Sequence, residues 1–347
     1  MGAHDTRPPI LSTVTRISDL GTVPYRVEVL PRDVWATGDY VACEAIGEAS
    51  AELDVELPSG RMSKAMEGDM ILGALGKRMA TLEGVGDWQA IGEDLRLHAL
   101  TPAGLFGKAT STSPLRPPFP ELQYRGHVVR DAKVAMGDFV EPVEPMLLHM
   151  PVILLIGTSM SAGKTSSGRT IIHELRRSGL KVAAAKLTGA ARYRDVLSFG
   201  DAGADPIFDF VDAGLPSTVC PEDEFRERLG LLLSRIAHTE AEVLVAEAGA
   251  SPLEPYNGSI AVEMLEANIA MTVLSASDPY AVLGVQQAFS RKPDVVSGPA
   301  ANTDAGIELV KKLCGVPALN LLRRSSLPAL RTILAEKLDI FAREAAS

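Results

Sequence analysis

The sequence contains few of the residues that mark a disulfide-linked or metal-binding protein. Its 347 residues include only three cysteines, Cys43, Cys220 and Cys314, and no two of them form a Cys-x-x-Cys pair. A scattered, odd set argues against a secreted disulfide framework and against a cysteine-based zinc site. The six histidines are not spaced like metal ligands either. The chemistry of this chain is therefore expected to rest on other side chains.

Long hydrophobic runs and an excess of positive charge are also missing. The longest strongly apolar run, 152–156, is far too short to cross a bilayer, and no apolar signal core opens the sequence. Lys and Arg number 34 against 44 Asp and Glu, so the net charge is −10. This balance argues against a broad basic face for nucleic-acid phosphates, although it permits a local cationic pocket. We expect a cytoplasmic protein that binds a small molecule, with neither a membrane nor a nucleic acid as partner.

Two parts of the sequence follow different patterns. In residues 1–143, apolar and polar side chains alternate over 23–30 and 51–57, as they do in half-buried strands. Gly-Asp pairs at 38–39, 68–69, 86–87 and 137–138 each precede an apolar residue and predict turns that lead into strands. This part is expected to form a smaller, mainly-β domain shaped like a barrel or sandwich.

In residues 144–347, short apolar runs alternate with helical stretches. This alternation predicts an α/β domain with a mostly parallel sheet flanked by helices. The composition of 46% hydrophobic and 22% charged residues is that of a folded globular chain. Strands are expected over 152–156, 182–186, 243–246, 271–275 and 295–297, and helices over 164–178, 223–238, 259–267, 279–288, 303–314 and 327–346.

The most specific motif lies between the first of these strands and the first helix. Residues 157–165 read Gly-Thr-Ser-Met-Ser-Ala-Gly-Lys-Thr, and this context is that of a phosphate-binding P-loop. Small residues let backbone N–H groups wrap a phosphate chain, and the start of the helix adds a positive dipole end. Lys164 would bridge the β- and γ-phosphates of ATP, and Thr165 would offer its hydroxyl to Mg²⁺. The residues predicted to bind the nucleotide are Gly157, Thr158, Ser159, Ser161, Ala162, Gly163, Lys164, Thr165 and Ser166, together with Asn302 and Thr303 from a later segment.

The loop departs from the common P-loop pattern, because five residues instead of four separate its glycines and Thr158 stands where the first glycine normally falls. The pattern Gly-Thr-x-x-x-x-Gly-Lys-Thr resembles the loop of dethiobiotin synthetase and related enzymes. Lys186-Leu-Thr-Gly follows the second strand, where that family places a substrate-contacting lysine. Glu247-Ala-Gly-Ala follows the third strand and resembles the family's Glu-Gly-Ala-Gly segment with its Mg²⁺-ligating glutamate. The resemblance implies catalytic roles for Lys164, Lys186 and Glu247.

A second resemblance rests on residues 247–258, which read Glu-Ala-Gly-Ala-Ser-Pro-Leu-Glu-Pro-Tyr-Asn-Gly. This segment is similar to the Glu-Gly-Gln-Gly-Ser…Pro-x-Tyr-x-Gly segment of a little-studied P-loop family that includes D-glutamate N-acetyltransferases. That family also has an Asn-Thr pair after a strand, matched here by Asn302 and Thr303. Both resemblances cover only about 150–310, and the first 140 residues resemble neither family.

Several of these residues have a structural alternative. Asn302 and Thr303 could contact the adenine edge or cap the following helix. Asp195 would join Thr165 and Glu247 as a metal ligand, or cap a turn, and Asp201 and Asp205 are rival candidates. Ser251, Tyr256 and Asn257 are expected to line a pocket for the acceptor. Arg192 and Arg194 would hold a substrate carboxylate or lie on the surface.

These observations favour an ATP- and Mg²⁺-dependent enzyme that activates a small carboxylate- or amine-bearing metabolite by phosphoryl transfer, as a ligase or kinase. One alternative is an N-acyltransferase whose P-loop holds the phosphates of acetyl-CoA. Another is an accessory NTPase that acts as a nucleotide switch. The family resemblance implies a homodimer.

Overall fold

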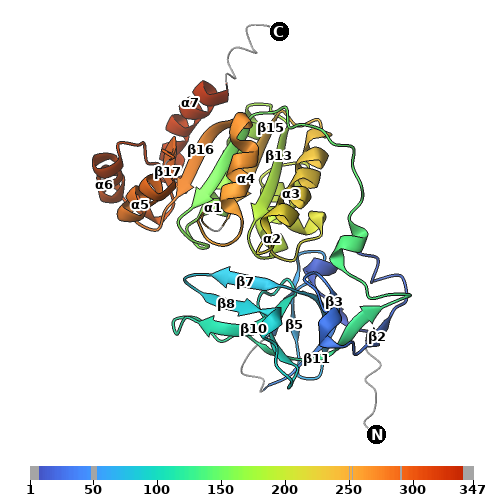
Figure 1. Cartoon of the computed structure of the whole chain (residues 1–347). Coiled ribbons are helices and arrows are strands. Elements are labelled where there is room, and N and C mark those ends of the chain that lie inside the picture. The colour runs from blue at the N-terminus through green and yellow to red at the C-terminus, as the bar shows by residue number, and fades with distance from the viewer. Residues whose placement is uncertain (1–7, 48–52, 250, 252, 290, 339–347) are drawn as a thin grey trace. The chain divides into compact units, whose positions relative to one another are not determined.

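The computed structural model describes residues 8–47, 53–249, 251, 253–289 and 291–338 (Figure 1). The chain divides into two compact units. The first comprises residues 1–141, 190–193 and 210–219, and the second comprises 142–189, 194–209 and 220–347. Two short segments from the C-terminal half of the sequence therefore belong to the first unit, which the sequence pattern does not reveal.

The first unit is built around a closed ring of five strands. β6 pairs with β3, β3 with β11, β11 with β9 and β9 with β10, and β10 closes the ring by pairing in parallel with β6. The ring encloses a core that includes Val41, Leu97 and Phe106, all of them buried. This confirms the small, mainly-β domain. The strands are β1 (Ile10–Leu11), β2 (Arg26–Glu28), β3 (Tyr40–Ala45), β4 (Leu53–Glu56), β5 (Met62–Ala65), β6 (Met70–Leu75), β7 (Lys77–Ala80), β8 (Gly84–Asp87), β9 (Arg96–Ala99), β10 (Leu105–Thr112) and β11 (Glu121–Val129).

Some expectations for this unit need correction. The strand expected over 23–30 shrinks to β2, and the one expected over 51–57 is β4, with 51–52 outside the described residues. Two Gly-Asp pairs do precede strands, β3 and β6, but the other two do not: Asp87 ends β8, and Asp138 lies in a 3₁₀ turn. In all four pairs the Asp carboxylate accepts a hydrogen bond from a nearby backbone N–H. The pair therefore specifies a capped turn, and the next element depends on what packs there.

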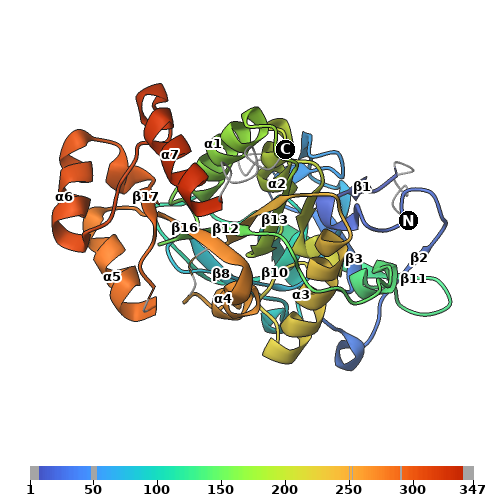
Figure 2. The same ribbon diagram turned by 90° about the horizontal axis from the view of Figure 1, so that it is seen from above.

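The second unit is a six-stranded, entirely parallel sheet in the order β14-β13-β15-β12-β16-β17. Helices α1 and α7 cover one face and α3 and α4 the other (Figure 2). Both faces are thereby buried, which is why the strands are continuous apolar runs in the sequence. The strands are β12 (Val152–Gly157), β13 (Val182–Thr188), β14 (Ile207–Asp209), β15 (Val243–Ala248), β16 (Ile269–Ser275) and β17 (Val295–Ser297). The helices are α1 (Lys164–Arg177), α2 (Tyr193–Asp201), α3 (Glu222–Ala237), α4 (Gly258–Leu265), α5 (Pro279–Phe289), α6 (Asp304–Cys314) and α7 (Leu327–Leu338).

Every strand and helix expected in this unit is present, and the fold class is confirmed. For the helix expected over 327–346, residues 339–346 lie outside the described part of the chain. The sequence pattern missed β14 and α2, which are short. α2 is stabilised by tertiary packing, since Phe199 is fully buried and lies against Gly168 of α1. Within the described ranges, no helix combines the length and the apolar character needed to span a membrane.

Candidate nucleotide-binding site

The loop between β12 and α1 holds its lysine in a defined position. Gly163 caps α1 with a left-handed φ of +97°, a conformation that glycine adopts without steric cost. Lys164 folds back over the loop, and its Nζ donates a hydrogen bond to the Ser159 carbonyl oxygen at 2.8 Å. A Cβ atom on Gly157 would lie 2.9 Å from this Nζ. The two glycines of the motif therefore shape the turn and leave room for the lysine.

Thr158, at the position where the common pattern has glycine, ties the loop to the neighbouring strand. Its N–H donates to the Ser275 carbonyl oxygen at 3.1 Å, and its Oγ1 accepts from the Ser277 N–H at 3.0 Å. On the same side, Gly298 lies so close to the Ala162 carbonyl oxygen that a Cβ would collide with it. The segments that follow β16 and β17 therefore support the loop.

Three charged residues meet at the carboxyl edge of the sheet. The strand register places Glu247 of β15 between Leu155 of β12 and Lys186 of β13. Thr165 Oγ1 donates to Glu247 Oε2 at 3.1 Å. Lys164, Lys186 and Glu247 are only 3%, 7% and 3% exposed. The structure thus brings the three predicted catalytic residues to one edge of the sheet, where open α/β sheets bind ligands.

Burial and charge act differently on the two lysines. Burial lowers the pKa of Lys164, with Glu247 opposing the shift and Lys186 adding to it. For Lys186, burial also lowers the pKa, but Asp195 and Glu247 together outweigh it and hold the pKa above its ordinary value. Lys186 Nζ lies 2.7 Å from Asp195 Oδ2. Of the two lysines, Lys164 therefore has the positive charge that the protein compensates less, and a bound anion would stabilise it.

The residues present fit a magnesium ion bound together with phosphates. The Thr165 hydroxyl and the Glu247 carboxylate are hydrogen-bonded to each other, and these are oxygen donors of the kind that Mg²⁺ prefers. No group of three or more His, Cys, Asp or Glu suited to a metal occurs in the described part of the chain. Mg²⁺ commonly takes one or two carboxylates and completes its shell with water and phosphate oxygens. Of the acidic candidates, Asp195 pairs with Lys186, whereas Asp201 and Asp205 are exposed.

The remaining predicted nucleotide ligands lie around the loop. Ala162 is buried, and Ser161 and Ser166 are exposed. Thr303 caps α6, because its Oγ1 accepts from the Gly306 N–H at 3.1 Å. Asn302 is exposed, and its carbonyl oxygen accepts from Asn320 at 3.0 Å. The capping alternative for Thr303 is thus observed, and contact of either residue with a base stays a prediction.

The segment that follows Glu247 carries three further predicted residues. Tyr256 is fully buried, and Asn257, at a φ of +60°, donates through its side chain to the Cys220 carbonyl oxygen at 3.0 Å. Both side chains stabilise the local fold, and their expected place in the lining of an acceptor pocket stays a prediction. Ser251 Oγ accepts from the Leu253 N–H at 3.3 Å. Ala250 and Pro252 of the same motif lie outside the described residues.

Gly249 is a site residue that the sequence pattern did not single out. A Cβ there would lie 3.1 Å from Glu247 Oε1 and 3.2 Å from Lys164 Cε. Thr188 Oγ1 donates to the carbonyl oxygen of Gly249 and so joins the ends of β13 and β15. The signal that could have found this position is a glycine two residues after a glutamate at a strand end.

The first unit has a cavity of its own, of about 380 Å³. Arg78 lies 5.3 Å from the ring centroid of Phe119 and pairs with Glu83, which also pairs with Arg116. These contacts hold the proline-rich stretch 113–120 over one side of the cavity, which Arg192 also lines. Arg192 thus lies in the first unit, and Arg194 belongs to α2.

Comparison with known proteins does not assign the chain to a family. No family model and no curated protein matches the chain. Among solved structures, chloroplast FtsY from Physcomitrella patens has 12% identity over 51% of this chain and 59% of that one, with a TM-score of 0.33. The 54 kDa signal recognition particle protein from Aeropyrum pernix K1, in complex with GDP, has 17% identity over 57% of this chain and 50% of that one, with a TM-score of 0.34. A DUF1611 family protein from Anabaena variabilis has 14% identity over 57% of this chain and 61% of that one, with a TM-score of 0.32.

This chain therefore spans only half to about three fifths of each of these structures. Similarity at this level carries no argument about activity, substrate or partner. The resemblances to dethiobiotin synthetase and to the acetyltransferase family stay predictions that rest on the motifs alone.

Proposed function

We propose that the second unit binds ATP with Mg²⁺ at the P-loop and transfers the γ-phosphoryl group to a small carboxylate- or amine-bearing metabolite, as a ligase or kinase does. One observation carries this proposal. Two buried lysines and one buried glutamate converge beside the phosphate-binding loop, at the carboxyl edge of a parallel sheet. Burying three charges in one place is costly unless they are paired or bind a ligand.

Each group has a role in this reaction. Lys164, the loop amides and the start of α1 would hold the phosphate chain and stabilise the charge that develops on the transferring group. Thr165 and Glu247 would hold Mg²⁺, which neutralises phosphate charge when bound. An acceptor oxygen or nitrogen would form the new bond to the γ-phosphorus as the bond to the β–γ bridging oxygen breaks, and ADP would leave.

Lys186 would orient the acceptor. The ion pair with Asp195 keeps Lys186 protonated. Lys186 lies near the end of β13, which is separated from the P-loop strand β12 by β15, the strand of Glu247. A second buried cation at the same edge of the sheet as the loop lysine suits an anionic group on the acceptor, such as a carboxylate. A switch protein that only hydrolyses its nucleotide has no need for such a group, which is why we favour the ligase or kinase function.

The acyltransferase alternative is supported by the motif at 247–258 and by the Asn-Thr pair at 302–303. In that case the P-loop would hold the pyrophosphate of coenzyme A, and no phosphoryl group would be transferred. Lys186 would then orient the amino-acid acceptor.

Calorimetric titration of the full chain with ATP–Mg²⁺, GTP–Mg²⁺ and acetyl-CoA distinguishes these functions. Lys164→Ala is the test variant, and Lys181→Ala is its control, since Lys181 is an exposed lysine of the same unit that pairs with Glu240. We expect ATP binding that is lost in Lys164→Ala and kept in Lys181→Ala, together with ADP release in the presence of a carboxylate metabolite that Lys186→Met abolishes. Acetyl-CoA binding with the same dependence, without ATP binding, would replace the proposal by the acyltransferase. Binding of all three ligands that is indifferent to Lys164 would overturn both.

A further inference from the structure

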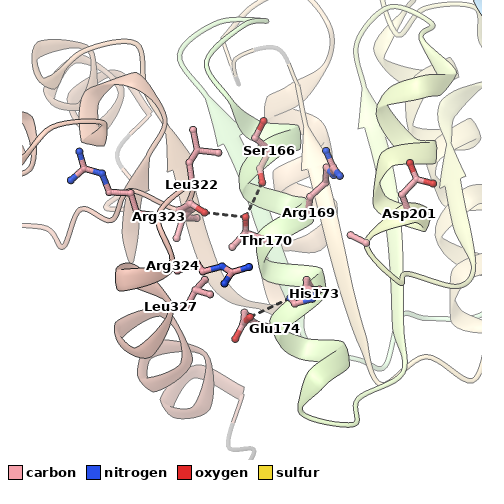
Figure 3. Close-up of a pocket in the computed structure, with 12 residues that line it drawn as sticks. Ser166, Arg169, Thr170, His173, Glu174, Asp201, Leu322, Arg323, Arg324 and Leu327 are labelled. Atoms are coloured by element: carbon pink, nitrogen blue, oxygen red, sulfur yellow. Dashed lines mark hydrogen bonds and ion pairs between the residues drawn. The ribbon is translucent and has the colours of Figure 1, made fainter.

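A groove of about 390 Å³ runs along α1 in the second unit. Figure 3 shows its walls, which are α1, the end of α2 and the segment 321–327. Ser166 lines it and stands two residues after Lys164, so the groove begins in the first turn of the P-loop helix. It continues past Thr170 and His173, about two helical turns further along. Apart from Ser166 and Asp201, no residue of this groove was predicted from the sequence to bind a ligand.

Two arginines line the groove without an ion pair. Among the described residues, neither Arg169 nor Arg324 forms a salt bridge, although the chain has 44 acidic residues against 34 basic ones. In Figure 3, Arg324 extends from its segment toward α1, whereas Arg169 extends from α1 on the side that faces α2 and Asp201. Both side chains are exposed, so each can turn into the groove from its own side. The neighbouring Arg323 differs, because its guanidinium lies 3.4 Å from Asp304 and points away from the groove.

The acidic residues of the groove do not neutralise these two cations. Glu174 is buried and is bound by Arg331 of α7 and by His173 at 3.3 Å. Although burial opposes it, hydrogen bonds from Arg331 and His173 hold the pKa of Glu174 below its ordinary value. Asp201 is exposed at the end of α2, and among the described residues it forms no salt bridge with Arg169 or Arg324. The groove thus offers two unpaired guanidinium groups, with the exposed hydroxyl of Ser166 on the P-loop side.

We propose that this groove binds a phosphate monoester group, held by Arg169 and Arg324. A guanidinium presents two parallel N–H donors that match a phosphate, and such charge-assisted pairs are stronger than neutral hydrogen bonds. Two sources share this chemistry. One is a ribose phosphate on the ligand whose pyrophosphate lies at the P-loop, as in coenzyme A, and the other is a separate phosphorylated metabolite bound beside ATP. The first source rests on the acyltransferase alternative, in which coenzyme A occupies the P-loop, whereas the second rests on the proposed function, in which ATP does.

Coenzyme A and dephospho-coenzyme A test the first source, because they differ only in the 3′-phosphate. The full chain is titrated with each, as wild type, Arg169→Gln, Arg324→Gln and the control Arg226→Gln, an exposed arginine of α3 that pairs with Glu263 and does not line the groove. If coenzyme A occupies the P-loop, it should bind about tenfold or more tightly than dephospho-coenzyme A in the wild type and in the control variant Arg226→Gln. Each groove variant should remove most of this difference and leave dephospho-coenzyme A binding unchanged.

Ribose 5-phosphate, titrated with and without saturating ATP–Mg²⁺, tests the second source. Binding that persists beside ATP and is lost in Arg169→Gln and Arg324→Gln assigns the groove to a separate phosphorylated metabolite. The inference is wrong if these two arginines affect neither the affinity difference between coenzyme A and dephospho-coenzyme A nor the binding of ribose 5-phosphate. That result is distinguishable from failure of the proposed function, which is read from the effect of Lys164→Ala on ATP binding.

Discussion

Replacing Gly157 by alanine should damage ligand binding without damaging the fold. A Cβ at this position would lie 2.9 Å from both Cδ and Nζ of Lys164, so the lysine must move. Its displaced end belongs to a flexible side chain, and Gly157 is not among the glycines with positive φ. We expect the free energy of unfolding to stay within about 1 kcal/mol of the wild type, because alanine also lowers the entropy of the unfolded chain.

The loss of binding follows from the displaced ammonium group. A hydrogen bond to a charged group contributes about 1.5–3 kcal/mol, so ATP–Mg²⁺ affinity should fall by about 10- to 100-fold. Calorimetric titration gives the affinity, and urea unfolding gives the stability. Unchanged affinity in Gly157→Ala would refute the argument that this glycine positions the lysine.

Gly168→Ala is the matched control and should behave in the opposite way. Its Cβ would lie 2.7 Å from Leu155 Cδ1 and 2.7 Å from Phe199 Cε1, and both side chains are fully buried. Overpacking of this kind costs about 1–3 kcal/mol, offset in part by about 1 kcal/mol from the better helix propensity of alanine. The variant should unfold at lower urea concentration and keep its ATP affinity. Equal stability losses in the two variants would mean that both sites are merely overpacked.

Two substitutions and one labelling experiment test the charges and burial described above. Asp195→Asn should lower the free energy of unfolding by about 1–3 kcal/mol at pH 7, since Lys186 stays buried and Asp195 is 26% exposed. The pKa of Lys186 is raised in the folded state, so the difference in the free energy of unfolding between the wild type and Asp195→Asn should be full at neutral pH and should decline above pH ~10.4, as measured by urea unfolding. Glu174→Gln should have a lower free energy of unfolding than the wild type at pH 7, because the lowered pKa of Glu174 stabilises the folded state there. This difference in the free energy of unfolding should shrink as the pH falls below ~4.3. Equal differences at pH 7 and pH 3 would contradict the reasoning. Cys43 is fully buried, and burial raises the pKa of its thiol, so mass spectrometry should find it unmodified by a thiol reagent at pH 8 until urea unfolds the chain.

The central elements of the second unit were predictable because their sequence pattern is a direct result of their burial. β12 is covered on both faces, and its six residues are all buried, so an apolar run marks it. α2 could not be found in this way. It spans nine residues that include Gly200, and Phe199 is buried only because Gly168 of α1 leaves space for its ring. The contact that stabilises α2 involves another element, which no local pattern records.

The candidate site likewise has a part that is visible in the sequence and a part that depends on tertiary contacts. The P-loop motif is visible in the sequence because a strand end, a glycine turn and a helix start are consecutive. The segments after β16 and β17, which support the loop, are not part of that local pattern. The ion pair of Lys186 with Asp195 and the hydrogen bond of Thr165 with Glu247 depend on strand register and helix placement.

The sequence by itself therefore determined the class of the second unit and the position of its P-loop motif. Only the tertiary structure decided which carboxylate pairs with which lysine, that Tyr256 is a core residue, and that Arg169 and Arg324 line one groove. These last two lie 155 positions apart in the chain. The physical reason is that backbone turns and helix starts are governed by neighbouring residues, whereas the environment of a charge is governed by whatever the packed sheet and helices bring next to it.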